Sequence, residues 1–264
     1  MDSLHSQAAE AAFAQPLTEE LLGAAGVTPG MRVLVFGRHL ADLALLVAER
    51  VGPTGAVIGL TEHCAIAHEA RRRAENEGFE RVEFRRGSLE DLTLDAPVDA
   101  AIGRFFLMNE PQPALAIRRA VDRVREGGRI IFQEWHYDSV RWPHSSDWPC
   151  VPLYRNFARW SLESFRRRRV SVDVGLRLAN LFAEAGLTVP HLRTDLRVVN
   201  GCNVLGYAFF ESTLRELLPT IERCGLAHAF DVDVDTFGAR LQRETVANGG
   251  HVFLPLQVGA WARC

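Results

Sequence analysis

Short apolar runs alternate with helical stretches between residue 31 and residue 134 of the chain. Each run is bounded by glycine or polar turns, a pattern typical of strands that are buried on both faces. The strands are predicted at 33–36, 56–60, 82–85, 100–102 and 129–134, and the helices between them at 42–51, 64–77 and 113–124. Strands joined by helical crossovers form a parallel sheet covered on both faces, so the pattern predicts an α/β fold.

Five turns follow the predicted strands and are expected at one edge of the sheet. They span residues 37–42, 61–64, 86–89, 103–109 and 134–138. Ligands of open α/β sheets bind in the crevice outside the carboxyl ends of the strands. We therefore expect these turns to surround one common cleft.

The chain is predicted to fall into four segments. Residues 1–30 form a helical lead-in, 31–137 the strand–helix core, 138–235 a helical lid or insertion with part of the core sheet, and 236–264 the last helix and strand of the core. Beyond the core, helices are predicted at 153–168, 175–185, 211–224 and 235–248, and a last strand at 252–261. Added elements in such folds sit where the loops are, so we expect the helical part to cover the cleft.

Composition narrows the class of protein. A length of 264 residues, 47% of them hydrophobic, suffices for one large domain or a domain with an accessory layer. The net charge of -3 gives no electrostatic case for nucleic acid, and the arginines at 166–169 are expected to be a solvated helix end. No apolar run approaches the roughly 20 residues of a membrane span, and no basic segment followed by an apolar core opens the chain. The expected location is the cytoplasm.

Lysine is absent, since all 30 basic residues are arginine. A lysine Schiff base is therefore excluded, and with it pyridoxal-phosphate enzymes and amine-type aldolases. The five cysteines are scattered and odd in number, which argues against a disulfide framework or a zinc knuckle. The spacing of His136 and His144 relative to Asp138 and Asp147 matches no recurrent ligand pattern, so no metal site is predicted.

Residues 32–46 read as a strand, a turn and the opening of a helix, and Gly37 is the only glycine in the turn. In a nucleotide-binding turn, glycines let the backbone adopt positive φ and approach the ligand closely. His39 and Ala41 occupy positions where glycine is expected. The turn therefore has the outline of a nucleotide site without its usual residues.

Several segments together carry a family resemblance. They are 33–46, 52–59 (GPTGAVIG), 70–74, 82–84, 89–92, 103–105, 125–129 (REGGR) and 259–261. In this order they resemble the class I S-adenosylmethionine-dependent methyltransferases, over nearly the whole chain. The resemblance implies a Rossmann-like core at 31–137 and a seven-stranded sheet whose last strand is antiparallel.

The departures from this family fall on positions that contact its cofactor. The family has an acid within the first strand, where this chain has Val35, and an acid near the adenine, where it has Ser88. At the end of the second strand an Asp or Glu usually holds the ribose hydroxyls. Thr61 stands there, and Glu62 follows one residue late.

A charge-assisted contact of this kind contributes about 1.5–3 kcal/mol, and each 1.4 kcal/mol is about tenfold in affinity. Four altered anchor points predict that the protein works without the cofactor. The alternative is that S-adenosylmethionine still binds, held by Gly37, Glu62 and Ser88, with Glu62 reaching in for Thr61.

The end of the fifth predicted strand, 133–138 (QEWHYD), is dense in titratable groups. Alternation along a strand points Glu134 and His136 to one side and Trp135 and Tyr137 to the other. A carboxylate and an imidazole within reach of one substrate exchange protons with it at neutral pH, so Glu134 and His136 are candidate catalytic residues. The competing interpretation is a helix-capping or turn contact for Glu134 and a core phenol for Tyr137. Tyr137 is the third catalytic candidate. His39 is the fourth, as an acid–base group or as a plug in the cofactor space.

Substrate-facing residues are expected after the fourth strand. Arg104 is a candidate partner for a substrate carboxylate, and Phe105 is a candidate aromatic wall, with core packing as its alternative. The remaining candidates for substrate binding are Met108, Asn109, Trp135 and Trp148.

These features predict an enzyme on a methyltransferase-like fold that has abandoned methyl transfer for acid–base chemistry on an aromatic small molecule. The reaction we favour is a ring closure of the Pictet–Spengler type in secondary-metabolite biosynthesis. A small-molecule methyltransferase with a divergent site is the first alternative, and a catalytically silent binding or scaffold subunit is the second. We also expect a homodimer, formed through the lead-in or through residues 140–170.

Overall fold

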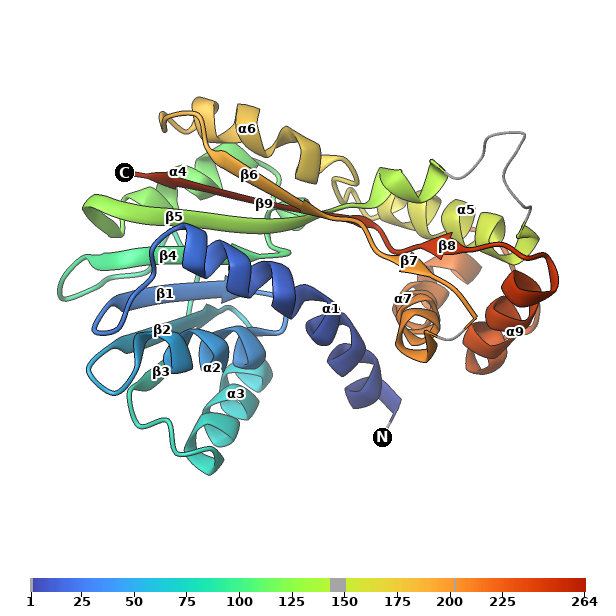
Figure 1. The fold of residues 1–264 in the computed structure, drawn as a ribbon, viewed down its shortest axis with the longest axis horizontal. Helices are drawn as coiled ribbons and strands as arrows, with labels where there is room; N and C mark the ends of the chain where they lie inside the picture. Colours follow the sequence, from blue (N-terminus) through green and yellow to red (C-terminus); the bar gives the residue numbers. More distant parts are fainter. Residues whose placement is uncertain (1, 143–150, 202) are drawn as a thin grey trace. The chain divides into compact units, whose positions relative to one another are not determined.

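The structure is a computed structural model that describes residues 2–142, 151–201 and 203–264 (Figure 1). The chain divides into two compact units, and each unit draws on three separate stretches. Unit 1 comprises Met1–Ala14, Trp135–Asp173 and Asp195–Gln257, and unit 2 comprises Gln15–Glu134, Val174–Thr194 and Val258–Cys264. The predicted division into four consecutive segments stays a prediction.

A seven-stranded sheet forms the centre of unit 2, with the order β3-β2-β1-β4-β5-β9-β6. Its strands are β1 Arg32–Gly37, β2 Ala56–Thr61, β3 Val82–Arg86, β4 Val98–Arg104, β5 Val124–His136, β6 His191–Asp195 and β9 Leu256–Arg263. Strands β1 to β5 pair in parallel. The amide of Gly127 donates to Cys264 (3.0 Å) and the amide of Cys264 donates to Gly128 (3.2 Å), so β9 runs antiparallel to β5. The predicted α/β class and the seven-stranded sheet are confirmed.

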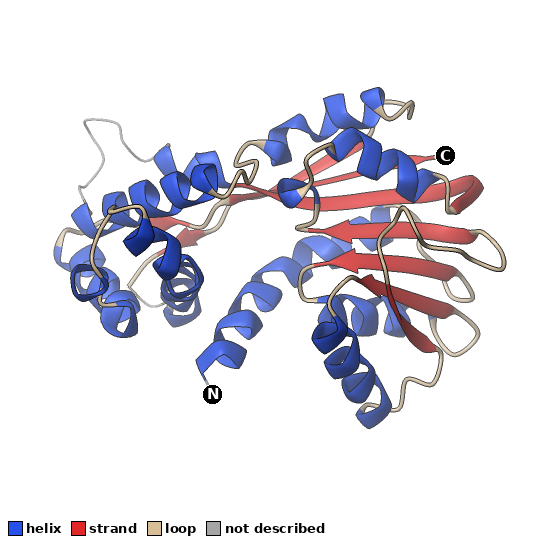
Figure 2. Cartoon of the chain, turned by 180° about the vertical axis from the view of Figure 1, so that it is seen from behind, coloured by secondary structure: helices blue, strands red, loops and turns tan. Residues whose placement is uncertain are grey.

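Helices cover both faces of this sheet (Figure 2). One face carries the second half of α1 (Asp2–Ala24), α2 (Leu40–Val51) and α3 (Cys64–Asn76), whose apolar side chains share one core with β1, β2 and β4. Helices α4 (Pro113–Val121) and α6 (Val174–Glu184) pack against each other, and the Phe182 ring of α6 contacts the Phe132 ring of β5. Leu40, Leu43 and Val47 of α2 recur at helical spacing and are buried, which explains why α2 lies on the sheet.

Unit 1 is mainly helical. It contains η2 (Tyr137–Arg141), α5 (Pro152–Arg167), α7 (Val204–Arg223), α8 (Ala229–Val232), α9 (Val234–Ala247) and the antiparallel pair β7 (Val198–Val199) and β8 (Val252–Phe253). Fully buried rings from three helices meet in its core, where Phe157 of α5 packs edge-on against Phe210 of α7 and tilted against Phe237 of α9. Such large buried rings supply much of the apolar area that a small helical unit needs.

Some predicted elements are corrected. The single last strand predicted at 252–261 is two strands, β8 and β9, and Pro255 lies in the break between them, where its missing N–H makes a continued ladder unfavourable. The helix predicted at 113–124 ends at Val121, because β5 already begins at Val124. The helix predicted from residue 211 begins at Val204. Strand β6 was not predicted, since its mostly exposed residues form no apolar run.

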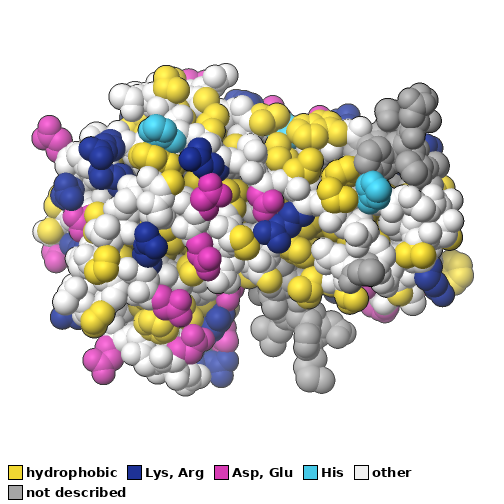
Figure 3. All heavy atoms as spheres, viewed as in Figure 1, with side chains coloured by type: hydrophobic (Ala, Val, Ile, Leu, Met, Phe, Trp, Pro, Cys, Tyr) yellow, Lys and Arg dark blue, Asp and Glu magenta, His cyan; other side chains and the backbone are white. Residues whose placement is uncertain are grey.

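The surface carries charges of both signs, as the face in Figure 3 shows. Among the described residues, no helix combines the length and the hydropathy needed to cross a membrane.

Candidate functional site

The β1–α2 turn lies at the carboxyl edge of the sheet and is tied to the end of β4. Gly37 has φ 108°, and a Cβ atom there would lie 2.1 Å from the carbonyl oxygen of Arg104. The amide of Arg38 donates to the same carbonyl at 2.8 Å. Gly37 is therefore required by the backbone packing of the turn on β4.

His39 keeps the backbone conformation of a glycine. Its φ of 52° and ψ of 47° lie in the left-handed region, and it caps the amino end of α2 without a side-chain capping bond. His is one of the few residue types enriched there, although a Cβ atom makes the region costly. The turn therefore preserves the path of a glycine-rich turn and adds an imidazole to it.

Arg104 lies beneath this turn and is 1% exposed. Its Nη2 donates to the carbonyl oxygen of His39 at 3.0 Å, so the guanidinium group helps to hold the turn in place. Its predicted role as a partner for a substrate carboxylate stays a prediction.

Thr61 and Val35 are the next two altered anchor positions. Val35 is fully buried in the core on β1, where an unpaired acid would be costly. Thr61 ends β2, and its Oγ1 accepts a hydrogen bond from the amide of His63 at 3.3 Å. The hydroxyl therefore caps its own loop.

Glu62 and Ser88 are two of the three residues expected to hold S-adenosylmethionine if it binds, the third being Gly37. Glu62 is exposed. The Oγ of Ser88 donates to Asp91 Oδ2 at 2.6 Å and accepts the amide of Asp91 at 3.2 Å, so it is engaged in a local turn. The family usually binds its cofactor with a carboxylate at the ribose and an acid near the adenine. The residues at these positions therefore do not reproduce that arrangement.

Glu134 is the most unusual titratable residue of unit 2. It lies on β5 and its side chain is fully buried. Its Oε1 accepts hydrogen bonds from the amides of Phe106 (2.9 Å) and Leu107 (2.8 Å), which lie in the turn that follows β4. This is a turn contact, one of the alternatives to a catalytic role for Glu134.

Only one of the two carboxyl oxygens of Glu134 is used in this way. Oε2 is buried and has no hydrogen-bond partner among the residues that the structure describes. Burial raises the pKa of Glu134 to about 8, against the opposing effect of the amides at 106–108 and with a further rise from Glu110. A carboxyl group with this pKa is mostly neutral at pH 7 and carries a proton that it can donate.

The turn after β4 combines strain and acidity. Phe105 is fully buried with φ 51°, a conformation that a bulky residue rarely adopts. It precedes η1 (Leu107–Asn109), in which Met108 is buried and Asn109 is exposed. Half-buried Glu110 follows, and burial raises its pKa, as does the charge of Glu62. Phe105 therefore belongs to the core, as its alternative interpretation expected.

Trp135, His136 and Tyr137 belong to unit 1, whereas Glu134 belongs to unit 2. The Trp135 and Tyr137 rings lie 6.1 Å apart, as the predicted alternation requires, and Tyr137 also packs on Phe165 at 4.6 Å. The Nδ1 of His136 lies 3.3 Å from the carbonyl oxygen of Asp173. Joint catalysis by Glu134 and His136 stays a prediction, as does the role of Tyr137.

Trp148 lies outside the described residues. Among the described residues, no group of three or more His, Cys, Asp or Glu side chains is arranged to hold a metal ion.

Two contributors to the site were missed from the sequence. Backbone amides such as those of Phe106 and Leu107 carry no sequence signature, so the partner of Glu134 could not be recognised. Glu110 had a signal that went unused, namely a carboxylate that directly follows a strand-end turn and precedes a proline.

The comparisons with known proteins agree with the fold. Residues 28–155 match the family model described as a methyltransferase domain. The fold also matches the YcgJ protein from Bacillus subtilis, with a TM-score of 0.57, 15% identity, and coverage of 93% of this chain and 96% of that one. The [4+2]-cyclase SpnF gives a TM-score of 0.53, with 18% identity and coverage of 94% and 79%.

Two curated relatives resemble parts of the chain. A 37.1 kDa protein of transposon TN4556 from Streptomyces fradiae is 33% identical over 172 residues, which is 64% of this chain and 47% of that protein. An arsenite methyltransferase from Aquipseudomonas alcaligenes is 28% identical over 125 residues, or 44% and 36% of the two lengths. The chain thus aligns with less than half of the length of either relative. The chain therefore has the class I methyltransferase fold, and residues 28–155 match a methyltransferase domain in sequence.

Proposed function

We propose that this protein is an enzyme of the methyltransferase fold that catalyses a proton-transfer reaction, without methyl transfer, on an aromatic small molecule. The reaction we favour is a ring closure, and Glu134 is its proposed acid. The observation that carries the proposal is a fully buried carboxyl group with a pKa of about 8, whose Oε2 has no hydrogen-bond partner in the described part of the chain.

A neutral buried carboxyl group is suited to proton donation. With a pKa of about 8, Glu134 is mostly protonated at pH 7. Its Oε1 is held as an acceptor by two amides, so the proton belongs on Oε2. Ring closures of the Pictet–Spengler type need an acid to protonate an imine and a base to restore aromaticity. An acid whose pKa lies near the working pH is efficient in the first role.

Access to Glu134 requires the turn after β4 to move, since the side chain is fully buried. Phe105, at the start of this turn, has a left-handed backbone that costs on the order of 1–2 kcal/mol. Strain of this kind concentrates at functional and switching segments. We therefore place substrate entry at the Phe105–Glu110 segment, with relief of this strain as part of the opening.

The proposal that the cofactor is not used is supported by the altered anchors. Thr61 and Ser88 direct their hydroxyl groups into local turns, and Val35 is a core residue. The fold is compatible with other chemistry, since the protein SpnF that shares it is a [4+2]-cyclase.

Calorimetric titration of the full chain with S-adenosylmethionine and S-adenosylhomocysteine tests the proposal. We expect dissociation constants above about 1 mM for both ligands. The matched variant, His39→Gly with Thr61→Asp, restores a glycine and a carboxylate, and it should bind at least tenfold more tightly. A low-micromolar dissociation constant for the unchanged protein would overturn the proposal, whatever the variant does.

The protonation state of Glu134 is tested separately. A ¹³C-carboxyl NMR titration, with Glu134→Gln to assign the signal, should give a pKa near 8 for this residue. A pKa below about 5.5 would remove Glu134 as the acid, because almost none of it would then be protonated at pH 7.

A methyltransferase with a divergent site is the second candidate. It is favoured by the positive φ of both Gly37 and His39, which preserves the backbone of the nucleotide-binding turn, and by the sequence match to an arsenite methyltransferase. The same titration distinguishes the two functions, because only this candidate requires tight binding of S-adenosylmethionine.

A further inference from the structure

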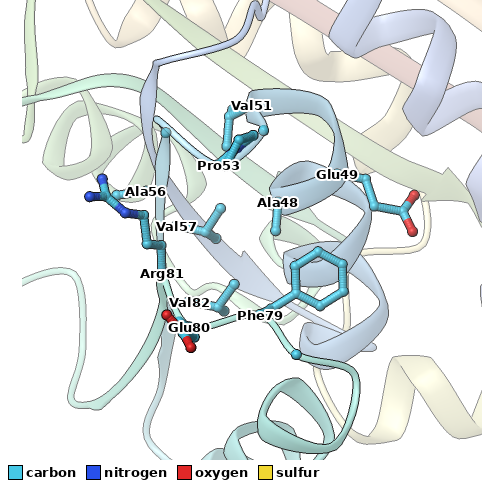
Figure 4. A pocket seen from close by; sticks show the side chains of 13 residues that line it. Ala48, Glu49, Val51, Pro53, Ala56, Val57, Phe79, Glu80, Arg81 and Val82 are labelled. Atoms are coloured by element: carbon cyan, nitrogen blue, oxygen red, sulfur yellow. The ribbon is translucent and has the colours of Figure 1, made fainter.

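A groove lies at the opposite, amino edge of the sheet, where β2 and β3 begin (Figure 4). It consists of two adjoining hollows of about 430 Å³ and 670 Å³, which share residues 56–57 and 78–82. Both hollows are formed entirely by residues of unit 2. The groove is separate from the carboxyl edge at which the proposed reaction takes place.

The floor of the smaller hollow is apolar. Val51 and Val57 are each 1% exposed and belong to the central core, and Phe79 and Val82 pack against that core while remaining partly exposed. In Figure 4 the Phe79 ring lies beside Val82, below Val57 and Ala48. An apolar ligand that covers this floor therefore removes both ring and aliphatic surface from water.

Some of the charged side chains around the groove have hydrogen-bond partners and others do not. Arg32 and Arg71, in the larger hollow, donate to the carbonyl oxygens of Ala96 and Phe84 at 2.8 Å. Among the described residues, the side chains without a hydrogen bond or ion pair at the groove include three carboxylates, Glu49, Glu75 and Glu80, and one guanidinium group, Arg81. A hydrogen bond to a neutral carbonyl leaves the charge of a guanidinium group in place, so all lining charges are counted. The four carboxylates, with Glu83 included, outnumber the three guanidinium groups, and the lining is negative overall.

We propose that this groove binds an apolar primary ammonium compound of the arylalkylamine class. The aromatic body would lie on Val57, Phe79 and Val82, and the ammonium group would point to Glu49 or Glu80. Charge complementarity favours a cation over a neutral or anionic ligand of the same shape. A volume of about 430 Å³ lies within the range of small-molecule sites, and the Phe79 ring offers a face to a cation.

Three probes of similar shape and different charge test this inference: 2-phenylethylammonium, 2-phenylethanol and 3-phenylpropanoate. Amide chemical shifts of the full chain report both the place of binding and the dissociation constant. We expect shifts at Val57, Phe79 and Val82. We also expect binding of the cation two- to fivefold tighter than that of the alcohol, weakest binding of the anion, and a preference that falls as salt is added.

Variants that remove a negative or a positive charge should change the affinity for the cation in opposite directions. Glu49→Gln and Glu80→Gln should each weaken binding of 2-phenylethylammonium about twofold, whereas Arg81→Gln should strengthen it about twofold. Glu126→Gln changes an exposed carboxylate that does not line the groove and should have no effect. All four side chains are exposed, so the variants are expected to fold.

The inference is overturned by equal binding of the three probes, by tightest binding of the anion, or by shifts that lie outside the groove. It is also overturned if the cation causes no shift at about 20 mM, a concentration at which even a weak site would be detected. None of these results depends on S-adenosylmethionine or on Glu134.

Discussion

The two edges of the parallel sheet in unit 2 use the same kinds of residue in opposite ways. At the carboxyl edge, Gly37 is pressed against the backbone of Arg104, and the carboxyl group of Glu134 is fully buried. At the amino edge, Gly78 also has a positive φ, 79°, but a Cβ atom there would meet nothing within 4 Å, and the carboxylate of Glu49 is exposed.

The carboxyl edge should therefore tolerate few substitutions, whereas the amino edge should tolerate many. Close packing at the carboxyl edge holds a glycine, a left-handed His39 and a neutral acid in costly states, and such states persist only where the surrounding structure enforces them. The amino edge has space and solvated charges, so single changes there should have small effects. The following predictions test this comparison, beginning with the largest effect.

Gly37→Ala should destabilise the protein by about 4 kcal/mol or prevent it from folding. The new Cβ atom would lie 2.1 Å from a backbone oxygen that cannot move without distorting β4. The matched change at the amino edge, Gly78→Ala, meets open space and should cost about 1 kcal/mol, from its positive φ alone.

Urea unfolding of both glycine variants, followed by circular dichroism, measures the difference. Similar losses of stability in the two variants would contradict the distinction between the edges.

Glu134→Gln should remove a pH dependence of stability. Burial raises the pKa of Glu134 from 4.5 to about 8, so the folded protein binds more protons than the unfolded chain between these values. The free energy of unfolding therefore falls as the pH rises through this window, by roughly 1.4 kcal/mol per pH unit. Glutamine cannot ionise, so this slope should disappear in the variant.

Unfolding free energies at pH 5, 6, 7 and 8 provide the test, with exposed Glu126→Gln as a control that keeps the slope of the unchanged protein. Burial also raises the pKa of Glu110, which leaves a smaller slope of the same sign in the Glu134→Gln protein. An unchanged slope in this variant would show that Glu134 is ionised in the folded state.

His39→Gly should change stability least, with a gain of about 0.5 kcal/mol. Glycine adopts φ 52° and ψ 47° without the steric cost that a Cβ atom adds, and its greater freedom in the unfolded chain offsets part of the gain. Thermal unfolding detects such a shift. A loss of more than about 1 kcal/mol would instead mean that the imidazole fills space in the turn, as the plug hypothesis requires.

The sequence predicted the central strands well because their signal is local. β1 and β2 are apolar runs between turns, and they lie within one residue of the predicted ranges. Where long-range pairing decides the structure, prediction was poorer. β5 begins at Val124, five residues before the predicted start, because Val124 pairs with Val98 of β4, and Gly127 and Gly128 form hydrogen bonds with Cys264.

The candidate site was predictable only in part. The sequence identified Glu134, His39 and Arg104 as candidate site residues at the carboxyl edge of the sheet. Their partners were not, because the carbonyl oxygen of His39 and the amides of Phe106 and Leu107 are backbone groups that every residue carries.

The alternation of apolar runs and helical stretches was sufficient to establish the α/β class. The four altered anchor positions raised the question of whether the cofactor binds. Spacing along a chain specifies which residues share a face. Only the tertiary structure decided that Glu134 is buried, with one oxygen unpartnered among the described residues, and that the backbone of Gly37 lies against that of Arg104. Both facts depend on the distance between β1, β4 and β5, which are remote in sequence and adjacent in the sheet.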